Sequence, residues 1–274
     1  MKKRDLLLAI DLEDVRDQIP DGHHYQDRVE VNVEQILDLL ESRNARATFF
    51  TVGTIARRLP GLLREILDQG HEIAAHGNNH TQLTKLDPLA FETDLNQNID
   101  SLLAAGVPVV SGFRAPTFSL TERTGWAHDV LASQGVRYSS SVLPAKNPLF
   151  GWPEFGEESR RLPNGLVEIP ITLHPRPLPR VPLAGGVYLR VLPFSLTRFS
   201  FGRVKRSRPV TTYIHPYDVD IAQEHFMHPD LNGSRWMNRL MYIGRKNALT
   251  RLGRLIDQSN VWRYIDWVEQ HYPA

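Results

Sequence analysis

The first half of the chain alternates short apolar runs with helix-like segments, and this alternation constrains the fold more than any other feature. Apolar runs that predict strands lie at 6–10, 47–52, 71–75, 107–113 and 136–142. Segments with apolar residues at helical spacing lie between them, at 29–43, 60–69, 87–105 and 121–134. This order is typical of parallel strands joined by crossover helices. The sequence therefore predicts an α/β fold.

Two of the predicted helices carry boundary signals. Pro60 and Pro88 stand at first helical positions, where a missing N–H costs nothing. Asp87 is a suitable N-cap, and Gly70 is a suitable stop. These signals support helices at 60–69 and 87–105.

The second half is less regular. Residues 143–186 are rich in Pro and Gly, and strands are predicted at 166–170 and 209–214. Two helices, near 235–256 and 262–271, are predicted to end the chain. Because both halves carry candidate site residues, we expect one domain over 1–274, with a core at about 5–220 and C-terminal helices at about 221–274.

The composition narrows the chemistry. The chain of 274 residues has no cysteine, which excludes disulfides, thiolate zinc sites and a cysteine nucleophile. Any metal ion must be held by His and carboxylate groups. The net charge of +1 does not indicate a general polyanion binder, and nucleic-acid binding has little support.

The apolar content also bears on location. The first apolar run, 6–10, is followed at once by acidic residues and is too short for the core of a signal peptide. No stretch reaches the roughly 20 apolar residues that span a bilayer. We therefore expect a cytoplasmic protein.

Polar residues follow the predicted strands at the points where those strands end. Asp11, His76, Arg114, Ser139 and His215 occupy these positions. In parallel barrels the active site lies at the carboxyl ends of the strands. We expect these side chains to gather at one end of the sheet.

His76 and His80 lie four positions apart in the sequence and can bind one metal ion. One carboxylate from the cluster Asp11, Glu13 and Asp14 would complete a His-His-carboxylate set with an open position for water, as in catalytic zinc sites. Asp11 and Glu13 point the same way if the strand continues, whereas Asp14 requires the chain to curl. A second carboxylate could act as base.

His215 and Arg114 complete the candidate set. His215 follows a buried-type strand and could protonate a leaving amine. Arg114 could supply a fixed positive charge that orients the base carboxylate.

In this order, the motifs resemble those of the polysaccharide deacetylases, carbohydrate esterase family four with the nodulation-type deacetylase fold. The motifs are Ile10-Asp-Leu-Glu-Asp14, His76-Gly-Asn-Asn-His80, Arg114-Ala-Pro116 and Ile214-His215. The resemblance covers about 6–220. It is nearest to the branch associated with exopolysaccharide and exosortase gene clusters, which has an extra C-terminal region and a segment like Leu183-Ala-Gly-Gly-Val-Tyr188.

The resemblance implies a distorted (β/α)7 barrel and a metal-dependent N-deacetylase of amino sugars. It implies that His76 and His80 bind the metal, most simply zinc, and that Asp11 is the general base. It also implies that His215 is the general acid and that Arg114 orients Asp11. The Thr117 N–H would be an oxyanion donor.

Three departures from the family pattern affect the site. Many members have adjacent aspartates in the first motif, so here either Glu13 or Asp14 could be the third ligand. No Asp–Trp motif supports His215, and 138–141 reads Tyr-Ser-Ser-Ser where relatives of this branch often have Tyr-Asp, so the partner of His215 stays open. Gly77 replaces the common Ser or Thr after the first His.

The segment 169–217 bears on the substrate because it contains no Asp or Glu. Eight Lys or Arg lie within 176–208, interleaved with apolar residues. They suit a solvated face or an attraction to phosphate. We expect an amino-sugar or glycan intermediate, nucleotide- or polyprenyl-pyrophosphate-linked, and peripheral membrane contact through 176–208.

Two other functions fit the same residues. One is a deformylase or another hydrolase of small amides with this fold. The other is a non-catalytic barrel that binds glycans.

Overall fold

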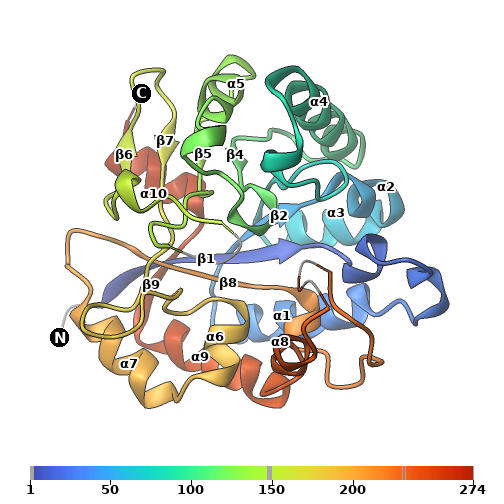
Figure 1. Cartoon of the computed structure of the whole chain (residues 1–274), viewed down its shortest axis with the longest axis vertical. Helices are drawn as coiled ribbons and strands as arrows, with labels where there is room; N and C mark the ends of the chain where they lie inside the picture. Colours follow the sequence, from blue (N-terminus) through green and yellow to red (C-terminus); the bar gives the residue numbers. More distant parts are fainter. Residues whose placement is uncertain (1–2, 147–149, 230, 232, 274) are drawn as a thin grey trace.

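The computed structural model describes residues 3–146, 150–229, 231 and 233–273. Its centre is a single curled sheet in the order β6-β7-β5-β4-β3-β2-β1-β8, with β9 also paired to β1 (Figure 1). All pairings are parallel except that of β6 with β7. The predicted distorted barrel of parallel βα units is confirmed.

The strands differ greatly in length. They are β1 Arg4–Leu12, β2 Thr48–Thr51, β3 Glu72–Ala75, β4 Gly112–Phe113, β5 Tyr138–Ser139, β6 Arg160–Arg161, β7 Val167–Glu168, β8 Val210–Ile214 and β9 Ser259–Trp262. The longest, β1, pairs with three neighbours. It is therefore the axis on which the sheet is built.

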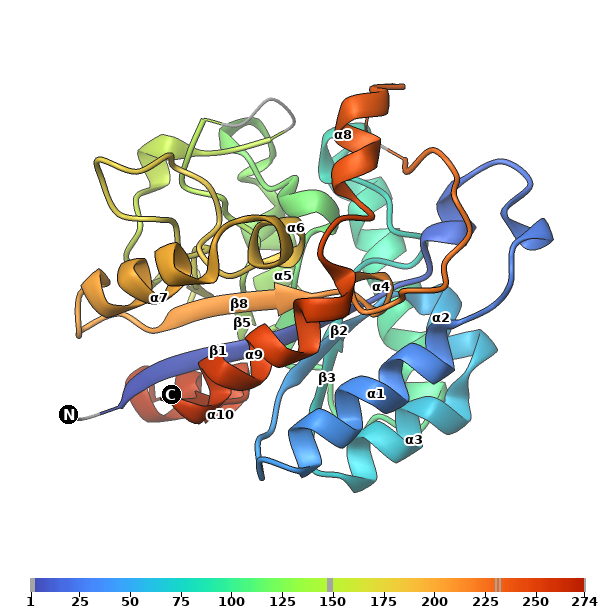
Figure 2. The ribbon, with the colours of Figure 1, turned by 90° about the horizontal axis from the view of Figure 1, so that it is seen from below.

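The helices cover the outer face and one end of the sheet (Figures 1 and 2). They are α1 Val29–Glu41, α2 Gly53–Arg58, α3 Pro60–Asp68, α4 Pro88–Ala104, α5 Ala127–Ser133, α6 Gly186–Val191, α7 Phe194–Arg203, α8 Arg235–Leu240, α9 Ala248–Asp257 and α10 Tyr264–His271. As predicted, Asp87 caps α4, since its carboxylate accepts from the Ala90 N–H at 2.8 Å.

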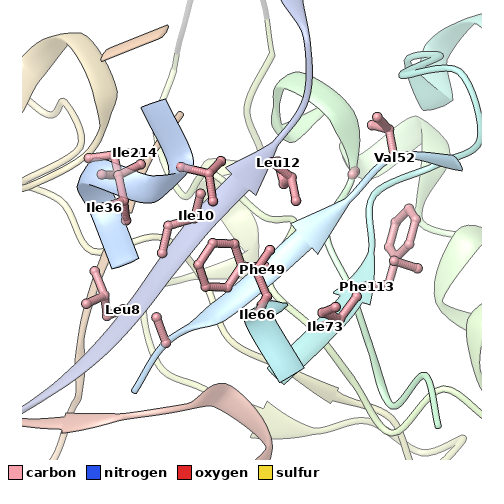
Figure 3. Close-up of a cluster of buried hydrophobic side chains, with 14 of the residues drawn as sticks. Leu8, Ile10, Leu12, Ile36, Phe49, Val52, Ile66, Ile73, Phe113 and Ile214 are labelled. Atoms are coloured by element: carbon pink, nitrogen blue, oxygen red, sulfur yellow. The ribbon is translucent and has the colours of Figure 1, made fainter. Parts of the chain in front are cut away.

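The alternation of side chains along β1 separates two hydrophobic clusters. Leu6, Leu8, Ile10 and Leu12 face the outer helices, where they pack with residues such as Ile36, Phe49 and Ile214 (Figure 3). Leu7 and Ala9 face the opposite way, into a cluster that includes Tyr264, Trp267 and Val268 of α10. Strand geometry places Asp11 on this inner face with Leu7 and Ala9. The C-terminal helix α10 thus fills the interior beneath Asp11.

Several element bounds differ from the predictions. The apolar runs 107–113 and 136–142 form only the two-residue strands β4 and β5, since the other residues of each run do not pair with a neighbouring strand. Within the predicted helix 121–134, the structure has a 3-10 turn followed by the shorter helix α5. The predicted helix 235–256 is interrupted at Gly244, because its φ of +79° does not occur within an α-helix. A residue with a Cβ at this position would clash with the Arg190 carbonyl. Helices α2, α6 and α7 were not predicted.

The C-terminal residues are not only helical. They also contribute β9, which pairs with β1 from Arg4 opposite Ser259 to Leu7 opposite Trp262. Residues 221–274 are thus part of the central sheet as well as its cover. Among the described residues, no helix is long and apolar enough to cross a membrane.

Candidate functional site

The carboxyl ends of β1 and β8 bring Asp11 and His215 together. β8 pairs with β1 with Ile214 opposite Ile10, so the next residue of each strand emerges at the same place. His215 Nε2 lies 3.9 Å from Asp11 Oδ2 and 3.8 Å from Glu13 Oε1. The expected meeting of these side chains at one end of the sheet is therefore observed.

Arg114 holds Asp11 from below. Its Nη1 donates to Asp11 Oδ1 at 2.6 Å, and its Nε donates to the Ser140 carbonyl at 3.1 Å. Its guanidinium is fully buried and lies 4.1 Å from the centre of the Phe50 ring. A buried cation is stable only when it is paired and hydrogen-bonded, and Asp11 supplies the opposite charge. Asp11 is thereby fixed in one orientation.

His76, His80 and Glu13 form a candidate metal site. Their ligand atoms all lie within 4.8 Å of one another, and His80 Nε2 lies 2.7 Å from Glu13 Oε2. His76 Nδ1 lies 2.8 Å from the Arg114 carbonyl, which can only accept, so Nδ1 carries the proton and Nε2 is free to bind a metal. Two imidazoles and a carboxylate are a donor set that fits a catalytic zinc ion.

Asp14 lies outside this cluster. Its carboxylate faces Arg16 Nη2 and Arg58 Nη2, both at 2.6 Å, and it caps the turn that begins at Val15. The chain does curl after β1, but the curl turns Asp14 away from the histidines. The geometry thus places Glu13, on the same side of the strand as Asp11, beside the two histidines.

The loop between the histidines has a backbone that few residues permit. Gly77 has a φ of +77°, and a Cβ there would lie 3.2 Å from Asp94 Oδ2 and 3.5 Å from Pro116 Cγ. A Ser or Thr at this position would be strained and crowded. His80 itself has a φ of +56°. This accounts for Gly77 where the family commonly has a hydroxyl residue.

The buried environment sets the charges of the candidate ligands. Burial lowers the pKa of His76 to about 4, so its imidazole is neutral at pH 7. Burial opposes the charge on Glu13, but the contact of its carboxylate with His80 at 2.7 Å lowers the pKa of Glu13 below its usual range. A neutral imidazole and an ionised carboxylate are the protonation states that bind a metal ion.

Asp218 is the partner of His215 that the sequence left open. His215 Nδ1 lies 2.8 Å from Asp218 Oδ2, and the His215 backbone N–H also donates to this oxygen at 2.9 Å. Asp218 Oδ1 accepts from Arg190 Nε of α6 at 2.7 Å, and neither ionic side chain is exposed. Burial opposes charge on His215, but Asp218 outweighs it and raises the pKa of His215 to about 9.

A sequence signal for Asp218 existed. The segment His215-Pro-Tyr-Asp218 places a carboxylate three residues after the histidine and a proline between them, a spacing typical of a short 3-10 turn. Arg190 gave no such signal, because only the packing of α6 brings it to Asp218.

Thr117 lies in a strained turn next to the site. Thr117 and Phe118 have consecutive positive φ values of 55° and 54°, which are unusual outside glycine. Among the described residues, no hydrogen bond of the Thr117 N–H is found, while its hydroxyl donates to the Pro116 carbonyl. The N–H predicted as an oxyanion donor is therefore free for a ligand.

Tyr264 is a further contributor that the sequence did not indicate. Its hydroxyl lies 2.9 Å from Arg114 Nη2, and its backbone N–H donates to Thr48 Oγ1. It reaches Arg114 because α10 packs against the inner face of the sheet. No local pattern could reveal this contact, since Tyr264 and Arg114 are 150 residues apart.

The cations of 176–208 do not form one surface. Four of the eight pair with acids: Arg190 with Asp218, Arg180 and Arg208 with Glu157, and Lys205 with Glu158. All these acids lie outside the acid-free segment 169–217. The charge of that segment taken alone therefore does not show that four of its cations are paired. Arg198 and Arg203 lie on α7, near the amino ends of β1 and β8 (Figure 2).

Comparison with known proteins found two family profiles that match the chain. The profile described as polysaccharide deacetylase matches residues 20–139. A second profile, described as a domain of unknown function (DUF3473), matches residues 140–269. By this match, residues 20–139 belong to the polysaccharide deacetylase family. The two matched ranges meet at the end of β5, inside one sheet.

Curated relatives match over limited segments. A chitooligosaccharide deacetylase from a Bradyrhizobium strain is 31% identical over 116 residues, which are 41% of this chain and 49% of the relative. A peptidoglycan-N-acetylglucosamine deacetylase from Listeria monocytogenes is 42% identical over 50 residues, 18% of this chain and 11% of the relative. The chain thus spans at most about half the length of these two relatives.

A solved structure supports the fold over nearly the whole chain. A proposed polysaccharide deacetylase from Mycobacterium smegmatis superposes with a TM-score of 0.64 at 20% identity. The superposition covers 98% of this chain and 90% of the other. The likeness in fold therefore extends over nearly the whole chain.

Proposed function

We propose that this family member is a metal-dependent hydrolase that removes an N-acyl group, most simply acetyl, from an amino sugar in a glycan or glycan intermediate. One observation carries the proposal: a fixed carboxylate, a His-His-Glu cluster and a charged histidine face the same space. These are Asp11, the cluster of Glu13, His76 and His80, and His215. Amide hydrolysis needs a base, an electrophile and an acid at such distances.

We propose Glu13, His76 and His80 as the protein ligands of a divalent metal ion. The fit rests on the donor set, on the fixed tautomer of His76 and on the ionised state of Glu13. Zinc suits two imidazoles and a carboxylate best. When bound, such an ion supplies Lewis-acid polarisation of the acyl carbonyl and makes water more acidic.

Asp11 is proposed as the general base. Its carboxylate is held by Arg114, so one oxygen is bonded and the other faces His215 and the site. This free oxygen accepts the proton of the attacking water. Arg114 acts through Asp11 as a positioning residue.

His215 is proposed as the general acid. Its Nδ1–H is held by Asp218, which leaves Nε2 directed toward Asp11 and Glu13. With a pKa of about 9, the imidazolium is present at neutral pH and can give its Nε2 proton to the leaving amine. The Thr117 N–H donates to the developing oxyanion.

The names of the relatives support the substrate class. They describe deacetylation of chitooligosaccharide and of the N-acetylglucosamine of peptidoglycan. Both substrates are N-acetylated amino-sugar polymers, which favours acetyl over formyl and a glycan over a small cyclic amide.

The finer substrate hypothesis concerns an anionic carrier. We infer a cytoplasmic intermediate of exopolysaccharide synthesis, nucleotide- or polyprenyl-pyrophosphate-linked. The exposed cations Arg198 and Arg203 lie about 20 Å from Asp11, since seven residues of β1 at about 3.3 Å each separate the two ends. Within 176–208 these cations would therefore contact an extended carrier rather than the sugar. Binding that weakens with salt and on neutralising Arg203 would support this.

The test is acyl release from a panel of substrates by the zinc- or cobalt-loaded protein. N-acetyl chitooligosaccharides should release acetate and free amine, whereas N-formyl sugars and non-sugar amides should react more slowly. Preference for a formyl group or a small amide would replace the proposal with that activity. Metal binding without any amine release would indicate a non-catalytic glycan-binding barrel.

A further inference from the structure

Exposed apolar side chains are concentrated in one segment beside the site. Five of the ten large hydrophobic side chains that are exposed in the described part of the chain lie between 221 and 243. They are Ile221, Met227, Trp236, Met237 and Ile243. We call these five residues, with α8, the rim segment. Exposed apolar side chains that gather in one region are candidates for an interaction surface.

The rim segment is connected to the proposed catalytic acid through two aromatic side chains. The Asn238 side chain of α8 accepts from the His228 N–H and donates to the Phe226 carbonyl, both at 2.9 Å. The His228 ring packs on Tyr217, which stacks on His215 with ring centres 4.6 Å apart. α8 therefore stands beside the mouth of the site, and Figure 2 shows it projecting from the body.

The outward side chains of α8 have the pattern of an interfacial helix. Trp236 is 71% exposed, and no residue of α8 is buried. Arg235 and Arg239 are one helical turn apart and lie on the same side. A tryptophan beside arginines suits the boundary between lipid headgroups and acyl chains.

The charges around the rim segment favour an anionic partner. Arg235, Arg239 and Lys246 are exposed, and none has an acidic partner among the described residues. Glu224 is the exposed acid in the described part of 221–246, and its carboxylate accepts from the neutral Gln26 N–H at 3.1 Å. Among the described residues of the rim, three exposed cations therefore outnumber one exposed acid.

We propose that the rim segment binds the surface of an anionic lipid bilayer. Trp236 and Met237 would enter the headgroup layer, and Arg235 and Arg239 would contact lipid phosphates. The site mouth would then face the bilayer. The consequence that the substrate is a glycan attached to lipid rests on the proposed function, whereas the binding surface itself does not.

The test is co-sedimentation of the full chain with vesicles of one part phosphatidylglycerol to three parts phosphatidylcholine, without substrate. The wild type should bind these vesicles and not vesicles of pure phosphatidylcholine. Arg235→Gln with Arg239→Gln should weaken binding about fivefold for each charge removed. Trp236→Ser with Met237→Ser should weaken it by about tenfold.

Two controls test whether binding is specific to the rim segment. Leu89→Ser removes a side chain that is 72% exposed on α4 and should leave vesicle binding unchanged. Arg198→Gln with Arg203→Gln removes two cations of α7 and should have a smaller effect than the rim variants. Each variant is checked for an unchanged melting temperature, so loss of fold is not mistaken for loss of binding.

Several outcomes would overturn the proposal. The first is a wild type that does not bind anionic vesicles. The second is a loss of vesicle binding in Leu89→Ser as large as in the rim variants. The third is a loss of vesicle binding in the α7 variant alone. Binding of soluble chitooligosaccharide that requires Trp236, without vesicle binding, would assign the segment to glycan instead. Asp11→Asn separates the two proposals: it should bind vesicles normally, whether or not it is inactive.

Discussion

The two halves of the sheet contribute to the site in different ways. Up to β5, each site residue lies in a short sequence motif at or directly after the end of a strand. His76 and His80, for example, follow β3. After β5, His215 depends on Asp218 and Arg190, while Tyr264 arrives from the last helix to contact Arg114. The first half thus holds the candidate ligands, the candidate base and Arg114, which positions that base. The second half holds the candidate acid His215 and the residues that set its charge, together with Tyr264, which supports Arg114.

This difference shows where each half is vulnerable. A change at Asp11 or at a candidate ligand in the first half removes a group that would touch metal or water. A change at Asp218 or Tyr264 in the second half alters an orientation or a pKa and leaves Asp11, the candidate ligands and His215 present. The predictions below use this contrast, from the largest expected effect to the smallest.

Asp11→Asn should have the largest effect. It keeps the size of the side chain and removes the proposed base, so kcat/KM should fall by about 10²–10⁴-fold. The measurement is acetate release by the metal-loaded protein at pH 7, with circular dichroism to confirm the fold. Turnover near the wild-type rate would show that Asp11 is not the base.

Glu13→Gln and Asp14→Asn form a matched pair that tests the metal site. Glu13→Gln should lower zinc affinity by about 100-fold or more, since it removes a direct charged ligand. Asp14→Asn should leave zinc affinity unchanged and lower the melting temperature, because Asp14 pairs with Arg16 and Arg58. Competition with a chelator measures the affinity. The reverse ranking would make Asp14 the ligand.

Asp218→Asn should change the pH dependence of activity. The pKa of His215 is raised to about 9 chiefly by Asp218. The wild type should therefore lose activity as the pH rises through about 9, because His215, the proposed acid, deprotonates there. Without the Asp218 charge, this alkaline loss should begin at lower pH, and kcat/KM at pH 7 should fall about tenfold. A pH profile of kcat/KM for both proteins is the measurement. If the alkaline loss of activity occurs at the same pH in both proteins, Asp218 does not set the pKa of His215.

Tyr264→Phe should have the smallest effect on activity. It leaves an Arg114 N–H without its 2.9 Å acceptor, at a cost of about 1–3 kcal/mol in unfolding free energy. A few-fold loss of kcat should accompany it, because Asp11 is less firmly oriented. Tyr272→Phe is the control, since its hydroxyl donates to the Ser159 carbonyl away from the site. If both variants lose stability but keep kcat, Tyr264 has only a structural role.

The predictable part of the fold followed from local patterns. The apolar period of β1 and the caps of α3 and α4 are visible in the sequence, because they depend on neighbours within a few residues. The short strands β4 and β5 were predicted too long, since an apolar run does not reveal how many of its residues reach a partner strand. β9 was missed because it is a strand only through pairing with β1.

For the site, the sequence by itself determined the candidate reacting side chains and the strand ends that carry them. Asp11, His76, Arg114 and His215 follow strands, and parallel strands end at one edge of the sheet. The tertiary structure alone decided that Glu13 rather than Asp14 lies with the histidines, and that Arg190 and Tyr264 support the site. These outcomes depend on how the chain curls after β1 and on where α6 and α10 pack. Contacts between residues far apart in sequence leave no local pattern.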